Sequence, residues 1–191
     1  WHFNVLSCSV EDLNTAVCTA FIRLGLLVKF RVPDMTLFKF VEAVNASYLD
    51  NPYHNWLHAV SVFQQAYTIT LHTVIADHLE FKDIFAMMVA ALAHDMGHRG
   101  RTNEFESKTL SDIALRYNDT SVLEQYHASQ LFEVILDPDT NILCGVSKPM
   151  FREMRRLLIA QIMTTDMKFH ADVMARMQGY LLEAEKTGGA L

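Results

Sequence analysis

Two short segments of this sequence carry residues whose types and spacing suit a metal site. His54 and His58 are four residues apart, and the same spacing separates His94 from His98, with Asp95 directly after His94. On a helix, residues four apart project from one face, so each histidine pair can point into a single site. Imidazole nitrogen and carboxylate oxygen suit zinc, whereas an oxygen-rich site suits magnesium or manganese. The sequence therefore predicts a site for two divalent ions, with Asp95 between them.

Asp95 stands where an uncompensated carboxylate is unfavourable. It follows the apolar run 84–93, and an ionised carboxylate there is costly to desolvate unless a cation or strong donors compensate its charge. In the alternative interpretation, Asp95 is a helix-end carboxylate that contacts Arg99 or Arg101. The histidines on both sides favour the metal-binding interpretation.

A bridged pair of metal ions indicates phosphoester hydrolysis. Such a pair clamps a phosphoryl group and lowers the pKa of the water between the ions, which produces a hydroxide nucleophile near neutral pH. The leaving oxygen then needs a proton, and a histidine that does not bind metal is a natural donor. On spacing alone, either His54 or His98 can serve.

The elements that must position these residues are helices. Ser9 and Asp12 form a capping-box-like start for a first helix, which ends at Gly25, and Asp34 is the expected cap of a second. Apolar residues then recur with a period of roughly 3.6, and no stretch alternates long enough to indicate a strand. The further predicted helices span residues 54–78, 83–93, 107–117, 121–135 and 149–164, with one more capped by Asp166. The predicted fold class is all-α, a compact multi-helix bundle.

Composition limits the classes of function. A chain of 191 residues with 51% hydrophobic side chains is typical of one domain with a sizeable core. Lys and Arg number 16 against 22 Asp and Glu, so the formal charge of −6 leaves no broad cationic surface for polymeric nucleic acid. A small anionic substrate is compatible with this charge, because bound cations reverse the local sign.

Cysteine usage and apolar runs indicate the compartment. Cys8, Cys18 and Cys144 are odd in number and widely separated, which predicts neither a disulfide framework nor a cysteine-based zinc site. The apolar run 84–93 is shorter than the roughly 18 residues that a membrane span needs, and the N-terminus has no secretory-signal pattern. We expect a cytoplasmic protein without a transmembrane segment. The sequence leaves the oligomeric state open.

Together, the two histidine segments resemble the signatures of class I cyclic-nucleotide phosphodiesterases. Residues 53–58 read Tyr-His-Asn-Trp-Leu-His, and residues 94–98 read His-Asp-Met-Gly-His, followed by Asn103. These segments are similar to H-N-x-x-H and H-D-x-x-H-x-x-x-x-N. The similarity continues through residues 118–124 and 164–167. It implies the HD-domain phosphodiesterase fold and hydrolysis of a 3′,5′-cyclic nucleotide, cyclic AMP or cyclic GMP, to the 5′-monophosphate.

The resemblance also implies individual roles. His54 would be the general acid that protonates the leaving O3′, while His58, His94 and Asp95 would bind the first ion, zinc. Asp95 would also reach the second ion, magnesium or manganese. The polar residues expected around the metal-bound waters are His98, Asn103, Glu124 and Thr165. The residues expected at the substrate pocket are Tyr53 and Met167.

The sequence departs from the family pattern in three respects. The family's catalytic domain continues beyond the position of Leu191 and there supplies another aspartate ligand, a purine-binding glutamine and a stacking phenylalanine. We therefore expect residues 1–191 to form one domain, the N-terminal portion of a longer catalytic domain, with little activity alone. Tyr126 stands where many members have the first of two adjacent histidines. Gly97 stands where others often have aspartate.

Two other functions stay open at this point. A different HD-type phosphohydrolase, such as a nucleotidase or a nucleoside triphosphate hydrolase, needs only the metal-binding framework, although the His-Asn segment at 54–55 argues against it. In the second alternative, which is not enzymatic, the chain is a regulatory or scaffolding fragment that binds metal without turnover.

Overall fold

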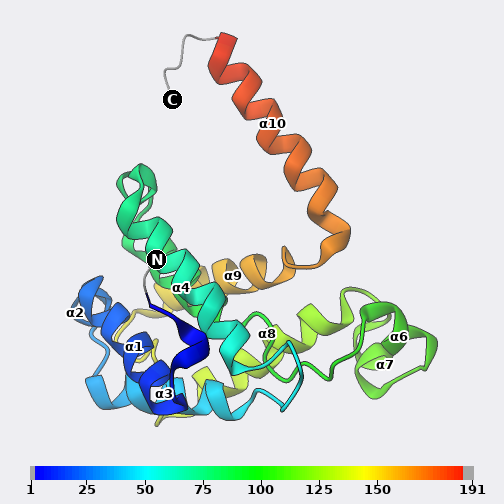
Figure 1. Ribbon diagram of the computed structural model, residues 1–191, viewed down its shortest axis with the longest axis horizontal. Coiled ribbons are helices and arrows are strands. Elements are labelled where there is room, and N and C mark those ends of the chain that lie inside the picture. The colour runs from blue at the N-terminus through cyan, green and yellow to red at the C-terminus, as the bar shows by residue number, and fades with distance from the viewer. Residues whose placement is uncertain (1–2, 187–191) are drawn as a thin grey trace.

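Helices account for all the regular structure that the computed structural model describes, which confirms the all-α prediction (Figure 1). The structure describes residues 3–186, and this part of the chain contains no strand. The α-helices and 3-10 helices (η) follow in the order η1 (Val5–Ser7), α1 (Val10–Arg23), α2 (Leu26–Phe30), α3 (Asp34–Ala46), α4 (Trp56–His72), η2 (Val74–His78), α5 (Phe81–Ala93), α6 (Asn103–Lys108), α7 (Asp112–Tyr117), α8 (Val122–Leu136), α9 (Lys148–Met163), η3 (Met167–Phe169) and α10 (His170–Lys186).

The central helix of the bundle is α5. It packs against α4 and α9 and also touches α2 and α8, so almost all of its surface is covered. Phe85 on this helix contacts Phe21 of α1 and Phe30 of α2, with ring centroids 5.9 Å and 4.6 Å away. Burying each such side chain contributes about 1.5–3 kcal/mol. This packing fixes the C-terminal end of α5, which His94 follows.

Most helix starts agree with the predicted caps. Ser9 and Asp12 form a reciprocal capping box at α1. Asp166 caps η3. The expected cap at Asp34 is wrong by one position, because Pro33 is the N-cap and Asp34 is the first helical residue. There its carboxylate still interacts favourably with the helix dipole.

The predicted helix over 54–78 starts later and ends earlier than expected. The Asn55 side chain accepts a hydrogen bond from the His58 N–H at 3.1 Å and caps α4, so the helix begins at Trp56. His54 therefore lies outside the helix. At the other end, Thr73 is extended and separates α4 from η2.

The predicted helix over 107–117 is two short helices, α6 and α7. Leu110 adopts a left-handed backbone with φ +52°, which breaks the helical path. Ser111 then starts α7, because its side chain accepts a hydrogen bond from the Ala114 N–H. These two helices form a lobe beside the N-terminal end of α8 (Figure 1).

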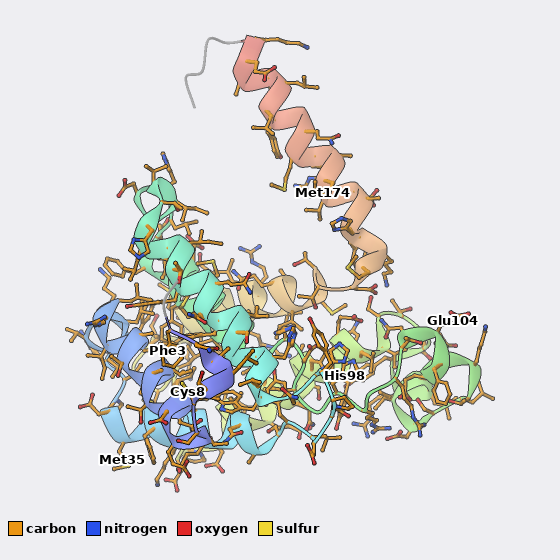
Figure 2. All side chains as sticks on the ribbon, in the orientation of Figure 1. Phe3, Cys8, Met35, His98, Glu104 and Met174 are labelled. Carbon is orange, nitrogen blue, oxygen red and sulfur yellow. The ribbon has the colours of Figure 1, made fainter. Side chains whose placement is uncertain are left out.

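The last helix, α10, extends away from the bundle (Figure 1). Figure 2 shows Met174 on this helix, well away from the packed side chains of the bundle. None of the residues 170–186 is buried. Large apolar side chains are exposed along it, at Val173, Met174, Met177, Tyr180, Leu181 and Leu182. Most of them are three or four residues apart and so share one face, and a continuous exposed apolar face is typical of an interaction surface.

Two further expectations concern thiols and membrane spans. Cys8, Cys18 and Cys144 are free thiols, as their spacing predicted. Within residues 3–186, no helix has both the length and the apolar character needed to cross a bilayer.

Candidate metal centre

A cavity of about 960 Å³ lies beside the C-terminal end of α5. Its walls come from α4, α5, α6 and α8, from the segments before α4 and after α5, and from the end of α9 through the start of η3. All ten residues that the sequence singled out line it: Tyr53, His54, His58, His94, Asp95, His98, Asn103, Glu124, Thr165 and Met167.

The turn that follows α5 is anchored to the end of α3. His94 is the C-cap of α5, and Gly97 with φ +70° turns the chain out of the helical path. The Tyr48 hydroxyl donates to the Leu92 carbonyl at 2.7 Å, which satisfies one of the free carbonyls at the helix end. The Gly97 N–H donates to the Ser47 carbonyl at 3.0 Å. These contacts fix the position of the turn on the cavity wall.

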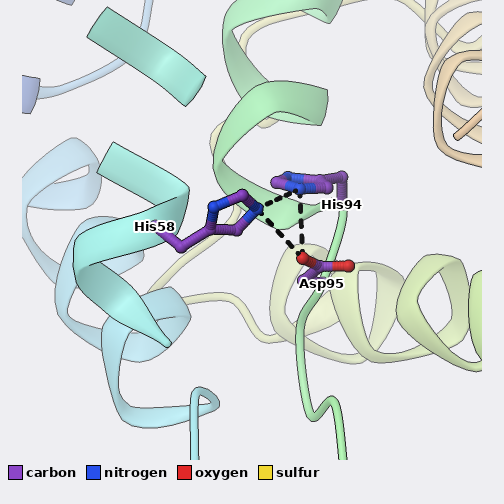
Figure 3. A group of neighbouring side chains, drawn as sticks. All are labelled: His58, His94 and Asp95. Atoms are coloured by element: carbon purple, nitrogen blue, oxygen red, sulfur yellow. Dashed lines mark hydrogen bonds and ion pairs between the residues drawn. The ribbon is translucent and has the colours of Figure 1, made fainter. Parts of the chain in front are cut away.

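Three potential ligands converge on one point, as Figure 3 shows. The His58 Nε2 atom lies 3.2 Å from His94 Nε2 and 3.3 Å from Asp95 Oδ2, and His94 Nε2 lies 3.1 Å from the same oxygen. Ligands at ~2.1 Å from one ion are separated by roughly 3.0 Å in an octahedron and roughly 3.4 Å in a tetrahedron. The three separations therefore fit a single divalent ion.

The charge and protonation of these groups also suit a cation. The His94 Nδ1–H donates to the Ala91 carbonyl at 3.0 Å, so a neutral ring has its Nε2 lone pair free for a cation, whereas a protonated ring donates from Nε2 to Asp95. Burial alone would raise the pKa of Asp95, but hydrogen bonds from His58 and His94 outweigh it and hold that pKa well below its ordinary value. Asp95 is therefore an anion throughout the neutral range.

The alternative in which Asp95 pairs with an arginine is wrong. Arg99 instead pairs with Asp112, with Nη2 3.0 Å from Oδ2. The Arg101 guanidinium lies over the Phe105 ring, 4.7 Å from its centroid. The partners of the Asp95 carboxylate in the described chain are histidines.

His54 and His98 reach the cavity from turns and not from helix faces. His54 precedes α4 and His98 follows α5, so the expectation that each pair projects from one helix is wrong. Their rings are nevertheless stacked, with centroids 3.9 Å apart and planes 18° apart. His98 is buried, and burial together with the nearby charge of His54 lowers its pKa. Its Nδ1 accepts the Gly100 N–H at 2.9 Å, so the neutral ring carries its proton on Nε2.

His127 belongs to this cluster but was not among the predicted site residues. It is buried, its Nδ1–H donates to the Met96 carbonyl at 2.7 Å, and its Nε2 lies 3.8 Å from Asp95 Oδ1. Burial lowers the pKa of His127 to about 4, so the ring is neutral at pH 7. Its position three residues after Glu124, on the same face of α8, is the signal that identifies it.

The remaining predicted residues surround the three ligands, and they range from buried to largely exposed. The Asn103 amide donates to both carboxylate oxygens of Glu124, at 3.2 Å and 2.9 Å. Burial raises the pKa of Glu124, and these hydrogen bonds offset part of the rise. The Thr165 hydroxyl donates to a carbonyl of its own turn. Tyr53 and Met167 are largely exposed at the cavity wall.

The Tyr126 ring occupies the space that a side chain at position 97 would need. A Cβ atom on residue 97 would lie 2.9 Å from Tyr126 Cε1, and residue 97 also has a left-handed φ. Gly97→Ala is therefore expected to lower the free energy of unfolding by about 2–4 kcal/mol, from overpacking and backbone strain together. Urea unfolding measures the loss. In a Tyr126→Leu background, only the backbone strain of about 1–2 kcal/mol should remain. An equal loss in both backgrounds would show that this contact is unimportant.

The chain is similar to characterised phosphodiesterases over most of its length. A family model described as 3′5′-cyclic nucleotide phosphodiesterase matches residues 53–188. The 3′,5′-cyclic-nucleotide phosphodiesterase regA of Dictyostelium discoideum is 35% identical over 182 residues, which cover 95% of this chain and 23% of that protein. The mouse dual specificity calcium/calmodulin-dependent 3′,5′-cyclic nucleotide phosphodiesterase 1B is also 35% identical, over 97% of this chain and 36% of its own length.

A solved structure has the same fold. The crystal structure of the phosphodiesterase domain of the RhoPDE fusion protein from the choanoflagellate Salpingoeca rosetta matches with a TM-score of 0.92 at 33% identity. The match covers all of this chain and 59% of that domain. The chain thus spans about a quarter to a third of the curated relatives and somewhat more than half of the solved domain. With the family match extending over more than two thirds of its residues, the chain belongs to the 3′5′-cyclic nucleotide phosphodiesterase family.

Proposed function

We propose that this chain is the metal-binding part of an enzyme that hydrolyses a 3′,5′-cyclic nucleotide, cyclic AMP or cyclic GMP, to the 5′-monophosphate. The observation that carries this proposal is the convergence of His58, His94 and Asp95 within 3.3 Å of one another on the wall of a large cavity. The same wall presents His54, which is not part of that triad. The substrate is a small molecule, in keeping with a net charge of −6.

The ligand atoms in this chain indicate which residues would bind each of two ions. His58, His94 and Asp95 would bind the first ion, which two imidazoles and one carboxylate suggest is zinc. Asp95 would also contact the second, magnesium or manganese. When bound, the ions would supply an activated water and neutralise charge on the phosphoryl group. The polar groups of His98, Asn103, Glu124 and Thr165 would orient water around them, and Tyr53 and Met167 would contact the substrate.

His54 is the better candidate for the general acid. Its ring centroid lies 5.9 Å from that of His58, so the imidazole is beside the triad without joining it. From there it would donate a proton to a leaving O3′ bound beside the triad. His98, the alternative donor, is only 6% exposed and lies behind the stacked ring of His54. This difference in access supports His54 as the donor.

We also propose that the chain is the N-terminal portion of a longer catalytic domain. Met174, Met177 and Leu181 on α10 are 42%, 54% and 62% exposed. Such an apolar face is unfavourable in water unless another segment packs against it. The solved domain is longer than this chain, which covers 59% of it. A cytoplasmic location is supported by the free thiols of the three cysteines.

Parallel assays test the proposed function. The chain, and a longer protein that contains it, would be supplied with zinc and magnesium and assayed with cyclic AMP, cyclic GMP and a deoxynucleoside triphosphate. We expect stoichiometric zinc in both, and cyclic-nucleotide hydrolysis in the longer protein. Hydrolysis of the triphosphate alone would identify another phosphohydrolase. Bound metal with no hydrolysis by either protein would favour the scaffolding function.

A further inference from the structure

Asn51, in the segment between α3 and α4, connects the two histidine segments. Its Nδ2 group donates to the His54 carbonyl at 3.1 Å and to the His98 carbonyl at 2.6 Å. A side-chain amide has two N–H donors, so these two bonds use both of them. The two residues that it anchors are the ones whose imidazoles stack at 3.9 Å.

The same network continues to a ligand of the triad. The Asn51 carbonyl accepts the Asn55 side-chain amide at 2.9 Å, and the Asn55 side-chain oxygen in turn accepts the His58 N–H at 3.1 Å. The path of hydrogen bonds therefore runs from the first turn of α4, which carries His58, to the turn after α5. It links the positions of His54, His58 and His98.

Gly100 leaves the space that the Asn51 amide occupies. A Cβ atom on residue 100 would lie 3.0 Å from Asn51 Oδ1, and the residue has φ +73°. Its N–H donates to His98 Nδ1. A glycine at this position therefore allows Asn51 to approach closely and also fixes the direction of the His98 ring.

His54 depends on such an anchor because its imidazole has no hydrogen-bond partner among residues 3–186. Its direction is determined by the backbone carbonyl that Asn51 holds, by the stacked ring of His98 and by the edge of the Tyr53 ring, whose centroid lies 4.9 Å away. A general acid must lie within hydrogen-bond reach of the leaving group, and a displacement of about 1 Å can cost ~100-fold in rate. We propose that Asn51, with Gly100 making room for it, is a positioning residue that aims His54. This inference rests on the proposed role of His54.

The variants Asn51→Asp and Asn51→Ala test the inference, with Asn45→Asp on α3 as the matched control. Asn51→Asp keeps the side-chain size but removes both donors. In NMR spectra of the chain, the His54 and His98 ring protons should shift because the stack loosens, while zinc affinity changes by less than about threefold. In the longer catalytic protein, kcat should fall about 10- to 100-fold with KM within about twofold. Unchanged ring resonances in both Asn51 variants would overturn the inference, whether or not the protein hydrolyses cyclic nucleotides.

A double-mutant cycle tests the contact with Gly100. Gly100→Ala should shift the His54 resonances when Asn51 is present and should have a smaller additional effect in the Asn51→Ala background. Circular dichroism establishes that each variant is folded, and Asn51→Asp provides a second readout if Asn51→Ala is not. Strictly additive shifts would show that the two residues act independently and would overturn the part assigned to Gly100.

Discussion

His54→Ala is expected to lower kcat by about 10²- to 10⁴-fold, while the zinc affinity changes by less than about threefold. The ring of His54 lies on the cavity wall beside the triad but is not one of its three ligand groups. The substitution therefore removes a proton donor and leaves the metal site in place. Steady-state kinetics on the longer catalytic protein and calorimetric zinc titration of this chain measure the two quantities. Near-normal turnover in the variant would contradict the assigned role.

A control variant and a second substrate sharpen this result. His72→Ala removes an exposed histidine at the end of α4, outside the cavity, and should leave both quantities unchanged. A cyclic nucleotide with sulfur at the leaving position needs little proton donation, because a thiol has a pKa of about 8.5. His54→Ala should therefore slow its hydrolysis much less than that of the natural ester. An equal loss of rate for both substrates would show that His54 positions the substrate or the ions and does not donate the proton.

Asp95→Asn is expected to abolish turnover and to weaken zinc binding by at least about 100-fold. Loss of a residue that merely supports a metal ligand costs about 10- to 100-fold in affinity, and Asp95 is proposed as a direct ligand. Its oxygen lies 3.3 Å from His58 Nε2 and 3.1 Å from His94 Nε2, and an amide there removes the negative charge that compensates the cation. Elemental analysis after dialysis and calorimetric titration measure the loss.

The control for Asp95→Asn is Asp112→Asn, which removes an exposed carboxylate that pairs with Arg99 outside the cavity. Zinc binding should then be the same as in the unmodified chain. Together, the two main variants separate the roles in the cavity, since His54→Ala uncouples metal binding from turnover and Asp95→Asn removes both. Full zinc occupancy in Asp95→Asn would show that the ion is held elsewhere.

Local patterns were sufficient to predict the helices and the chemical groups of the site. A run that is apolar nearly all round identified the buried α5, and Ser9 with Asp12 identified the start of α1, because both signals depend on neighbours within a few turns. The breaks were harder to predict. Leu110 and Thr73 carry no strong sequence signal, and their backbone conformations divide helices that the periodicity alone would continue.

The amino-acid sequence, through the spacing of its histidines and its resemblance to a family, indicated ten residues for metal, proton, water and substrate, and all ten line one cavity. Only the tertiary structure decided how they meet. Asn51 and His98 are 47 residues apart, and nothing in the spacing of either segment predicts the hydrogen bond between them. The spacing of apolar residues in α10 likewise predicts a helix, but it does not predict that its apolar face is exposed. Periodicity reports contacts along one helix, whereas the site depends on which helix ends are brought together by packing around α5.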